Sequence, residues 1–282
     1  MRASKACQML VQHLAIQTGN FRTLQVLVPS RPGTGPKDEY ISLVNTRVNP
    51  DDKGDFINHN YSSNELDAVH TFATSRITVD LWENALDKNI IWSWGKSPLK
   101  VDIQCEDIDA TFDRREQTIK FGHSGKSNTR TCQAIDIVAH ETTHAIIDSL
   151  KPGIHDGAEF KSLAWIETIC DLSALLVKIL VIGIDSEINY LTPNEFTEFA
   201  YGYRNDNKRT GLRSTLSIIP QKDDSKFYEL STRLTNEIFA NWLKKGYLKP
   251  MKGRITNCMD DLISKLDNIK KNPRLARGFS FD

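Results

Sequence analysis

The stretch His-Glu-Thr-Thr-His occupies residues 140–144 of the chain. Its flanks contain no glycine or proline and place apolar residues at helical intervals, which predicts a buried helix over about residues 128–149. Residues four apart lie on one face of a helix, so His140 and His144 can direct their imidazoles at one point. This spacing supplies two ligands of a catalytic zinc site, with Glu141 beside them as the general base.

A second helix, predicted from about Glu159 to Ile182, carries two acidic residues that are also four apart. Glu167 and Asp171 would lie on one face of this mostly apolar helix, where carboxylates without partners are costly to bury. Zinc would satisfy Glu167 as a third ligand, and the ring N–H of a ligand histidine would satisfy Asp171. The alternative interpretation is a partly exposed acidic stripe without a chemical role.

These two helices resemble those of the thermolysin-like zinc metallopeptidases, in the wider group whose third ligand is Glu. The resemblance rests on residues 135–148 and on Glu167 followed by Asp171. It extends over roughly residues 60–180 and then fades, and we expect the long C-terminal portion of the family to be shortened here. The resemblance implies a zinc-dependent peptidase, with an endopeptidase as the expected type.

The three expected ligands leave a position on one catalytic zinc ion open for water. Zinc lowers the pKa of a bound water from about 15.7 towards about 7. Glu141 would accept the proton of this water during attack on a peptide carbonyl and would pass it to the leaving amine. Asp171 would hold His140 or His144 in the correct tautomer.

Stabilising the developing oxyanion requires a further hydrogen-bond donor. The thermolysin-like family uses a Tyr shortly after the zinc helix and a distant downstream His. His155 stands where the resemblance places that Tyr, although it could be an ordinary loop histidine. The downstream His is missing, because none of the seven histidines follows residue 155. Several residues could replace it, and the sequence does not choose among Tyr201, Tyr203, Arg204, Arg209 and Arg213.

A candidate substrate-binding segment precedes the zinc helix. Endopeptidases of this kind bind an extended peptide along an edge strand through main-chain hydrogen bonds. The family's edge segment reads Asn-Ala-x-aromatic, and residues 109–112 read Asp-Ala-Thr-Phe in the similar place. The match is loose because Asp replaces Asn. The resemblance therefore implies substrate contacts at Asp109 and Ala110.

The resemblance also bears on calcium, which thermolysin-like enzymes commonly bind beside the zinc helix. Asp136 matches the acidic residue four positions before the first zinc histidine, but Lys178 stands where the family has a Glu ligand. A Lys ammonium has no lone pair to donate and repels a cation. We therefore expect no calcium at Asp136, and an ion pair between Asp136 and Lys178 in its place.

The other segments predict an α+β fold in which strands come first and helices follow. The capping box Ser62–Glu65 predicts a helix that ends near Leu86. Further strands are predicted at residues 21–28, 40–44, 99–105 and 119–121, and further helices begin near Thr192 and cover residues 227–242 and 255–269. We expect an N-terminal lobe of mixed α/β structure with a small sheet (1–150) and a mostly helical C-terminal lobe (151–282). The zinc helix would lie at the seam, and the second lobe would carry the third ligand.

Composition excludes several other classes. The 282 residues include 36 basic and 36 acidic side chains, so there is no global charge for binding nucleic acid. No apolar run approaches the length of a membrane span. The five cysteines are scattered and odd in number, which favours unpaired thiols in a reducing compartment. With no conventional signal peptide recognisable, we expect a cytoplasmic protein, or one exported without a cleaved signal, that acts on peptide or protein substrates.

Three alternatives remain open from sequence. The first is a non-catalytic zinc or partner-binding protein on a peptidase scaffold, which the missing downstream His favours and Glu141 opposes. The second is a helical interaction protein in which the His and Glu spacing is accidental. The third and weaker one is a metal-dependent aminopeptidase, for which no motif that captures a free amino terminus is recognisable.

Overall fold

The computed structural model describes residues 5–12, 21–106, 110–122, 130–154, 160–183, 198–199, 213–214, 225–247 and 254–271. Its strands are β1 (Lys5–Gln12), β2 (Phe21–Val28), β3 (Ile41–Val44), β4 (Leu99–Asp102), β5 (Ala110–Asp113), β6 (Thr118–Phe121), β7 (Glu198–Phe199) and β8 (Arg213–Ser214). Its α-helices are α1 (Ser63–Leu86), α2 (Ile135–Leu150), α3 (Phe160–Gly183), α5 (Ser225–Lys244) and α6 (Arg254–Lys271), and a 3₁₀ turn covers Thr131–Gln133. The predicted α+β class is confirmed.

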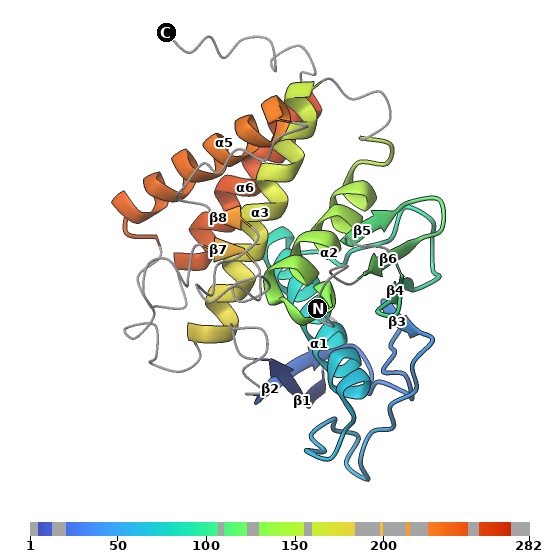
Figure 1. Ribbon diagram of the computed structural model, residues 1–282. Helices are drawn as coiled ribbons and strands as arrows, with labels where there is room; N and C mark the ends of the chain where they lie inside the picture. Colours follow the sequence, from blue (N-terminus) through green and yellow to red (C-terminus); the bar gives the residue numbers. More distant parts are fainter. Residues whose placement is uncertain are drawn as a thin grey trace, which may run out of the picture.

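A four-stranded mixed sheet in the order β3-β4-β6-β5 forms one side of the molecule. The first three strands are parallel, with Ile41 opposite Leu99, and α1 lies in the connection between β3 and β4. β5 runs antiparallel to β6 and forms one edge of the sheet. Figure 1 shows α2 between this sheet and a group of helices formed by α3, α5 and α6. The helix that holds the His-Glu-Thr-Thr-His stretch therefore lies between the two parts of the fold.

A separate hairpin of β1 and β2 begins the described chain. The expected strand at residues 21–28 is confirmed, whereas β1 is not among the predicted strands. Cys7, Met9 and Val11 alternate along β1 and are buried. The amide of Leu10 donates to the carbonyl of Phe56, at 3.1 Å, which attaches the hairpin to the chain that leads into α1.

The capping box predicted at the start of α1 is confirmed. The amide of Ser62 donates to Glu65 Oε2 at 2.8 Å, and the amide of Glu65 donates to Ser62 Oγ at 3.4 Å. The two side chains satisfy backbone donors that the first turn leaves without helical partners. The helix ends at Leu86, because Asp87 adopts the left-handed conformation with φ of 50°.

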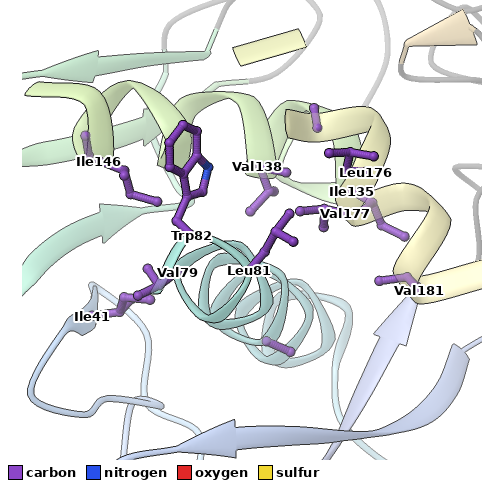
Figure 2. Close-up of a cluster of buried hydrophobic side chains, with 14 of the residues drawn as sticks. Ile41, Val79, Leu81, Trp82, Ile135, Val138, Ile146, Leu176, Val177 and Val181 are labelled. Atoms are coloured by element: carbon purple, nitrogen blue, oxygen red, sulfur yellow. The ribbon is translucent and has the colours of Figure 1, made fainter. Parts of the chain in front are cut away.

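Helices α1, α2 and α3 pack together through apolar side chains to form the core beside the candidate site. Figure 2 shows Leu81 and Trp82 of α1 directed towards α2 and α3, while Val79 lies beside Ile41 of β3. The partners labelled there are Ile135, Val138 and Ile146 of α2 and Leu176, Val177 and Val181 of α3. These side chains are nearly or completely buried.

One serine joins all three helices. The indole N–H of Trp82 (α1) donates to Ser173 Oγ (α3) at 2.9 Å, and the hydroxyl of Thr143 (α2) lies 3.0 Å from the same oxygen. These groups are buried, so the contacts replace hydrogen bonds to water. Ser173 therefore links α3 to α2 next to His144, which directly follows Thr143.

The start of the zinc helix differs from the prediction. Helix α2 begins at Ile135 instead of residue 128, and it is preceded by the 3₁₀ turn. The reason is that the amide and hydroxyl of Thr131 both lie within hydrogen-bond distance of the carbonyl of Gly122, at 2.9 and 3.1 Å. These contacts hold the chain near the end of β6. Ala134 is consequently extended, with φ of −95° and ψ of 117°.

The later helices agree with the predictions, since α3 begins at Phe160 and ends at Gly183, and α5 and α6 cover the two expected C-terminal segments. The capping box expected at Thr192 lies outside the described residues. The division into lobes at residue 150 stays a prediction. No helix in the described part of the chain is long and apolar enough to cross a membrane. The five cysteines, all within the described ranges, form no disulfide, as expected.

Candidate metal centre

His140 and His144 point their Nε2 atoms at each other across one turn of α2, at a distance of 3.0 Å. Glu167 of α3 faces both rings. Its Oε2 lies 3.3 Å from Nε2 of His140, and its Oε1 lies 3.3 Å from Nε2 of His144. The three side chains that the sequence predicts as ligands therefore converge, although they come from two helices.

The spacing of these atoms fits a zinc ion. A tetrahedral zinc with bonds of about 2.0–2.1 Å to N and O holds its ligand atoms about 3.3–3.4 Å apart. The measured separations among the nitrogens of His140 and His144 and the oxygens of Glu167 are 3.0, 3.3 and 3.3 Å. Two imidazoles and one carboxylate also make a donor set typical of catalytic zinc.

Asp171 lies behind this centre, one turn along α3 from Glu167. Its Oδ1 is 3.0 Å from Nδ1 of His140, the ring nitrogen on the side away from Glu167. The carboxylate is buried, so this contact is strong and directional. Asp171 therefore holds the His140 ring with Nε2 turned towards Glu167, which is the arrangement expected for a zinc-ligating histidine.

The acidic neighbours of His140 favour its protonated form. Burial by itself lowers the pKa of His140, but hydrogen bonds and charge from Asp171 and Glu167 outweigh it and raise the pKa to about 10. Burial raises the pKa of Glu167, but His144 and His140 together bring that pKa well below its usual value. The two histidines therefore favour the ionised form of the Glu167 carboxylate.

Glu141 follows His140 on α2 and shares its environment. His140, Glu141 and His144 keep 8%, 9% and 9% of their surface exposed, whereas Thr142 and Thr143 have none. The ligand side of α2 is therefore the side with access to solvent. A general base needs such access to meet water and substrate.

Residues 32–148 match the family model of the catalytic domain of thermolysin metallopeptidases. The resemblance to the thermolysin-like metallopeptidases is confirmed. The match starts earlier than the resemblance seen in the sequence and includes His140, Glu141 and His144. It ends before Glu167 and Asp171, which belong to the candidate site because both contact the ring of His140.

Among the solved structures that match the chain is a metalloproteinase precursor. It is the precursor of protealysin, a metalloproteinase from Serratia proteamaculans, with 16% sequence identity over 77% of this chain and 80% of that chain, and a TM-score of 0.44. No curated protein sequence matches the chain.

Part of the segment expected to bind substrate lies at the edge of the four-stranded sheet. Ala110 opens β5, the edge strand, while Asp109 and His155 lie outside the described residues. The Phe112 ring lies 6.1 Å from the Trp94 ring. These positions agree with a peptide-binding edge, but they do not test the predicted contacts.

A buried carboxylate connects this edge to α2. Asp148 receives a hydrogen bond from the Ser93 hydroxyl at 2.7 Å, and its other oxygen lies 3.1 Å from Nε of Arg114, in the turn after β5. The Asp148 side chain is fully buried, while that of Arg114 is 38% exposed. The contact ties the β5–β6 turn to the end of α2, so the edge strand and the metal ligands form one unit.

Asp136, where we expect no calcium, takes part in a buried ion pair. Nζ of Lys178 lies 3.0 Å from Oδ2 of Asp136, as the sequence predicts, and both side chains are buried. The pair connects α3 to the first turn of α2.

Cys170 also lies at the candidate metal centre, although it is not among the predicted site residues. Its Sγ and one ring nitrogen each of His140 and His144 all lie within 4.8 Å of one another. The only signal in the sequence is its place on α3, three residues after Glu167 and therefore on the same helical face.

Proposed function

We propose that this chain is a zinc-dependent endopeptidase. The observation that carries the proposal is the convergence of His140, His144 and Glu167 at zinc-ligand spacing, with Asp171 behind His140. The thermolysin-like match over residues 32–148 supports the same class of reaction.

Bound zinc would supply a Lewis acid that polarises the peptide carbonyl and acidifies a water molecule. Glu141 would accept the proton of the attacking water and return it to the leaving nitrogen. Asp171 would keep the His140 ring in its ligating tautomer through the 3.0 Å contact at Nδ1. The chain therefore supplies a base, a positioning carboxylate and three ligands within two neighbouring helices.

The substrate would be an extended peptide paired with β5. An edge strand offers backbone groups that a peptide can use as if it were another strand. Ala110 stands at the start of this edge, and Asp109 directly precedes it. We propose that His155 donates a hydrogen bond to the developing oxyanion, in the place of the family's Tyr.

A second candidate is a zinc protein without catalytic activity that binds a partner. The observation that favours it is the missing downstream histidine, since no histidine follows His155 in the sequence. An oxyanion without that donor loses a large part of its stabilisation. Such a protein would bind zinc in the same way, so only a test for hydrolysis separates the two candidates.

The decisive experiment is digestion of a peptide library with zinc, with a chelator, and with the Glu141→Gln variant. We expect cleavage products with zinc and none with chelator. Glu141→Gln should keep stoichiometric zinc and lose about 10²–10⁴-fold in rate, because an amide cannot accept the proton. Zinc content measured in Glu167→Ala should fall sharply, since a ligand is removed.

The outcomes divide the candidates. Stoichiometric zinc without cleavage of any peptide supports the non-catalytic protein. Absence of zinc from protein purified without chelator removes the metal site altogether. Activity of Glu141→Gln within a few-fold of the unmodified chain shows that another group is the base.

A further inference from the structure

The Cys170 side chain lies close to the two histidines of the candidate metal centre. Zinc bonds of about 2.0–2.1 Å to nitrogen and about 2.3 Å to sulfur hold these atoms about 3.6 Å apart in a tetrahedral site. The sulfur already lies within 4.8 Å of a ring nitrogen of His140 and of His144. Relative to these two nitrogens it would have to approach by up to about 1.2 Å, which is less than a change of side-chain rotamer supplies.

The position of Cys170 on α3 favours the same ligand set. Residues three apart on a helix share a face, and paired metal ligands at this spacing occur in helical metal sites. Glu167 and Cys170 are three apart. Asp171, the next residue, already contacts the outer nitrogen of His140. One turn of α3 thus brings two potential ligands and a positioning carboxylate to the histidines of α2.

The donor type gives a further reason. Thiolate is among the ligands that zinc prefers. The alternative is that the fully buried Cys170 only fills space as a small apolar side chain.

We propose that Cys170 supplies a fourth protein ligand to this zinc and takes the place that the attacking water needs. The thiol proton passes to solvent and the water ligand leaves, so no bond other than S–H and Zn–O is broken. The centre then has a closed, latent form and an open form in which the sulfur has turned away. This inference rests on the proposed zinc site and adds regulation of that site.

Cobalt(II) replacement of zinc gives a test that does not depend on activity. Thiolate bound to cobalt produces a charge-transfer band in the near ultraviolet, whereas nitrogen and oxygen ligands give only the weaker visible bands. The cobalt form of the unmodified chain should show the charge-transfer band. Cys170→Ser should lose it and keep the visible bands, and Cys258→Ser, which removes a buried thiol on α6, should keep both.

X-ray absorption of the zinc form adds an independent reading. We expect one sulfur at about 2.3 Å in the unmodified chain and none in Cys170→Ser or Cys170→Ala. Two substitutions are used so that a folding defect in one does not decide the result. Both variants should bind zinc at least tenfold more weakly and hydrolyse peptides at least tenfold faster at saturating zinc.

The results separate this inference from the proposed function. A cobalt form with visible bands but no charge-transfer band overturns the role of Cys170 and leaves the metal site intact. A charge-transfer band that survives in Cys170→Ser does the same. No binding of cobalt or zinc to the folded chain overturns both proposals.

Discussion

The ammonium of Lys178 lies 3.0 Å from the carboxylate of Asp136, and the two side chains are only 1% and 2% exposed. Removing one member of a buried pair leaves an uncompensated charge, which costs about 3–5 kcal/mol, whereas replacing both by apolar residues is often neutral. We expect Lys178→Met to lower the free energy of unfolding by about that amount, and Lys178→Met combined with Asp136→Leu to recover most of it. Urea denaturation of the three proteins measures this, and additive losses would contradict the pairing.

The same ion pair predicts that calcium does not stabilise the protein. A ligand that binds the folded state at 100 times its Kd adds about 2.7 kcal/mol to the free energy of unfolding. With Lys178 beside Asp136, we expect the melting temperature to stay constant as calcium rises into the millimolar range. A melting temperature that climbs with calcium, and stops climbing in Asp136→Asn, would show that the cation binds there.

The Asp171 carboxylate should matter without touching the metal. Asp171→Ala removes the 3.0 Å contact with Nδ1 of His140, and loss of such a partner typically reduces metal affinity or activity about 10–100-fold. Asp171→Asn keeps an acceptor oxygen and should be affected less. Competition with a chelator measures the zinc affinity of each variant. An affinity of Asp171→Ala equal to that of the unmodified chain would show that Asp171 does not position the ring.

Removing either partner of the Arg114–Asp148 contact should lower the free energy of unfolding, but by different amounts. Arg114→Ala leaves a fully buried carboxylate with weaker compensation, at a cost of about 2–4 kcal/mol. Asp148→Asn leaves an arginine that can turn to water, so we expect a loss of only about 1 kcal/mol. Chemical denaturation of both variants is the measurement. The reverse order would mean that burial of Asp148 is not what makes the contact important.

Stability should fall in acid partly because of His70, which is fully buried in α1. Burial lowers the pKa of His70 from 6.5 to about 3. Below pH 6.5 the unfolded chain therefore takes up a proton that the folded chain refuses until about pH 3. As the pH falls from 6.5 to about 3, this group alone lowers the free energy of unfolding by up to about 1.4 kcal/mol per pH unit. Above pH 6.5 it has no effect on stability.

His70→Gln should flatten the dependence of unfolding free energy on pH between 6.5 and 4. The exposed His59 provides the matched control, since His59→Gln removes an imidazole from the surface. Burial raises the pKa of Asp80 to about 7, so in part of this range Asp80 makes the free energy of unfolding rise as the pH falls. The effect of His70 is therefore read from the difference between the variant and the unmodified chain. Parallel curves for His70→Gln and the unmodified chain would contradict the assignment.

The parts of the structure that sequence reasoning predicted depend on neighbours close in the chain. The capping box of Ser62 and Glu65 satisfies backbone groups within one turn. The pairing of His140 with His144, and of Glu167 with Asp171, follows from the pitch of a helix. These local rules were enough to predict which side chains could share a metal.

The parts that it missed depend on contacts between distant segments. Helix α2 starts late because Thr131 contacts Gly122. β1 has five apolar residues of eight, as β2 has, but only Val11 among them is β-branched or aromatic, so its own segment does not indicate a strand without the pairing to β2. Cys170 becomes notable only when α3 packs on α2, because nothing in its own segment shows how near it comes to the histidines.

The parallel pairing of β3 with β4 has a consequence for how the protein folds. Ile41 lies opposite Leu99, a separation of 58 residues (99 minus 41), with all of α1 in between. Contacts this distant in sequence form slowly, whereas a local hairpin such as β1–β2 forms within about 1–10 μs. Since α2 packs between the sheet and α3, we expect the metal-binding histidines to meet Glu167 only after this crossover has closed. During refolding, the ability to capture zinc should therefore appear later than most of the helical signal.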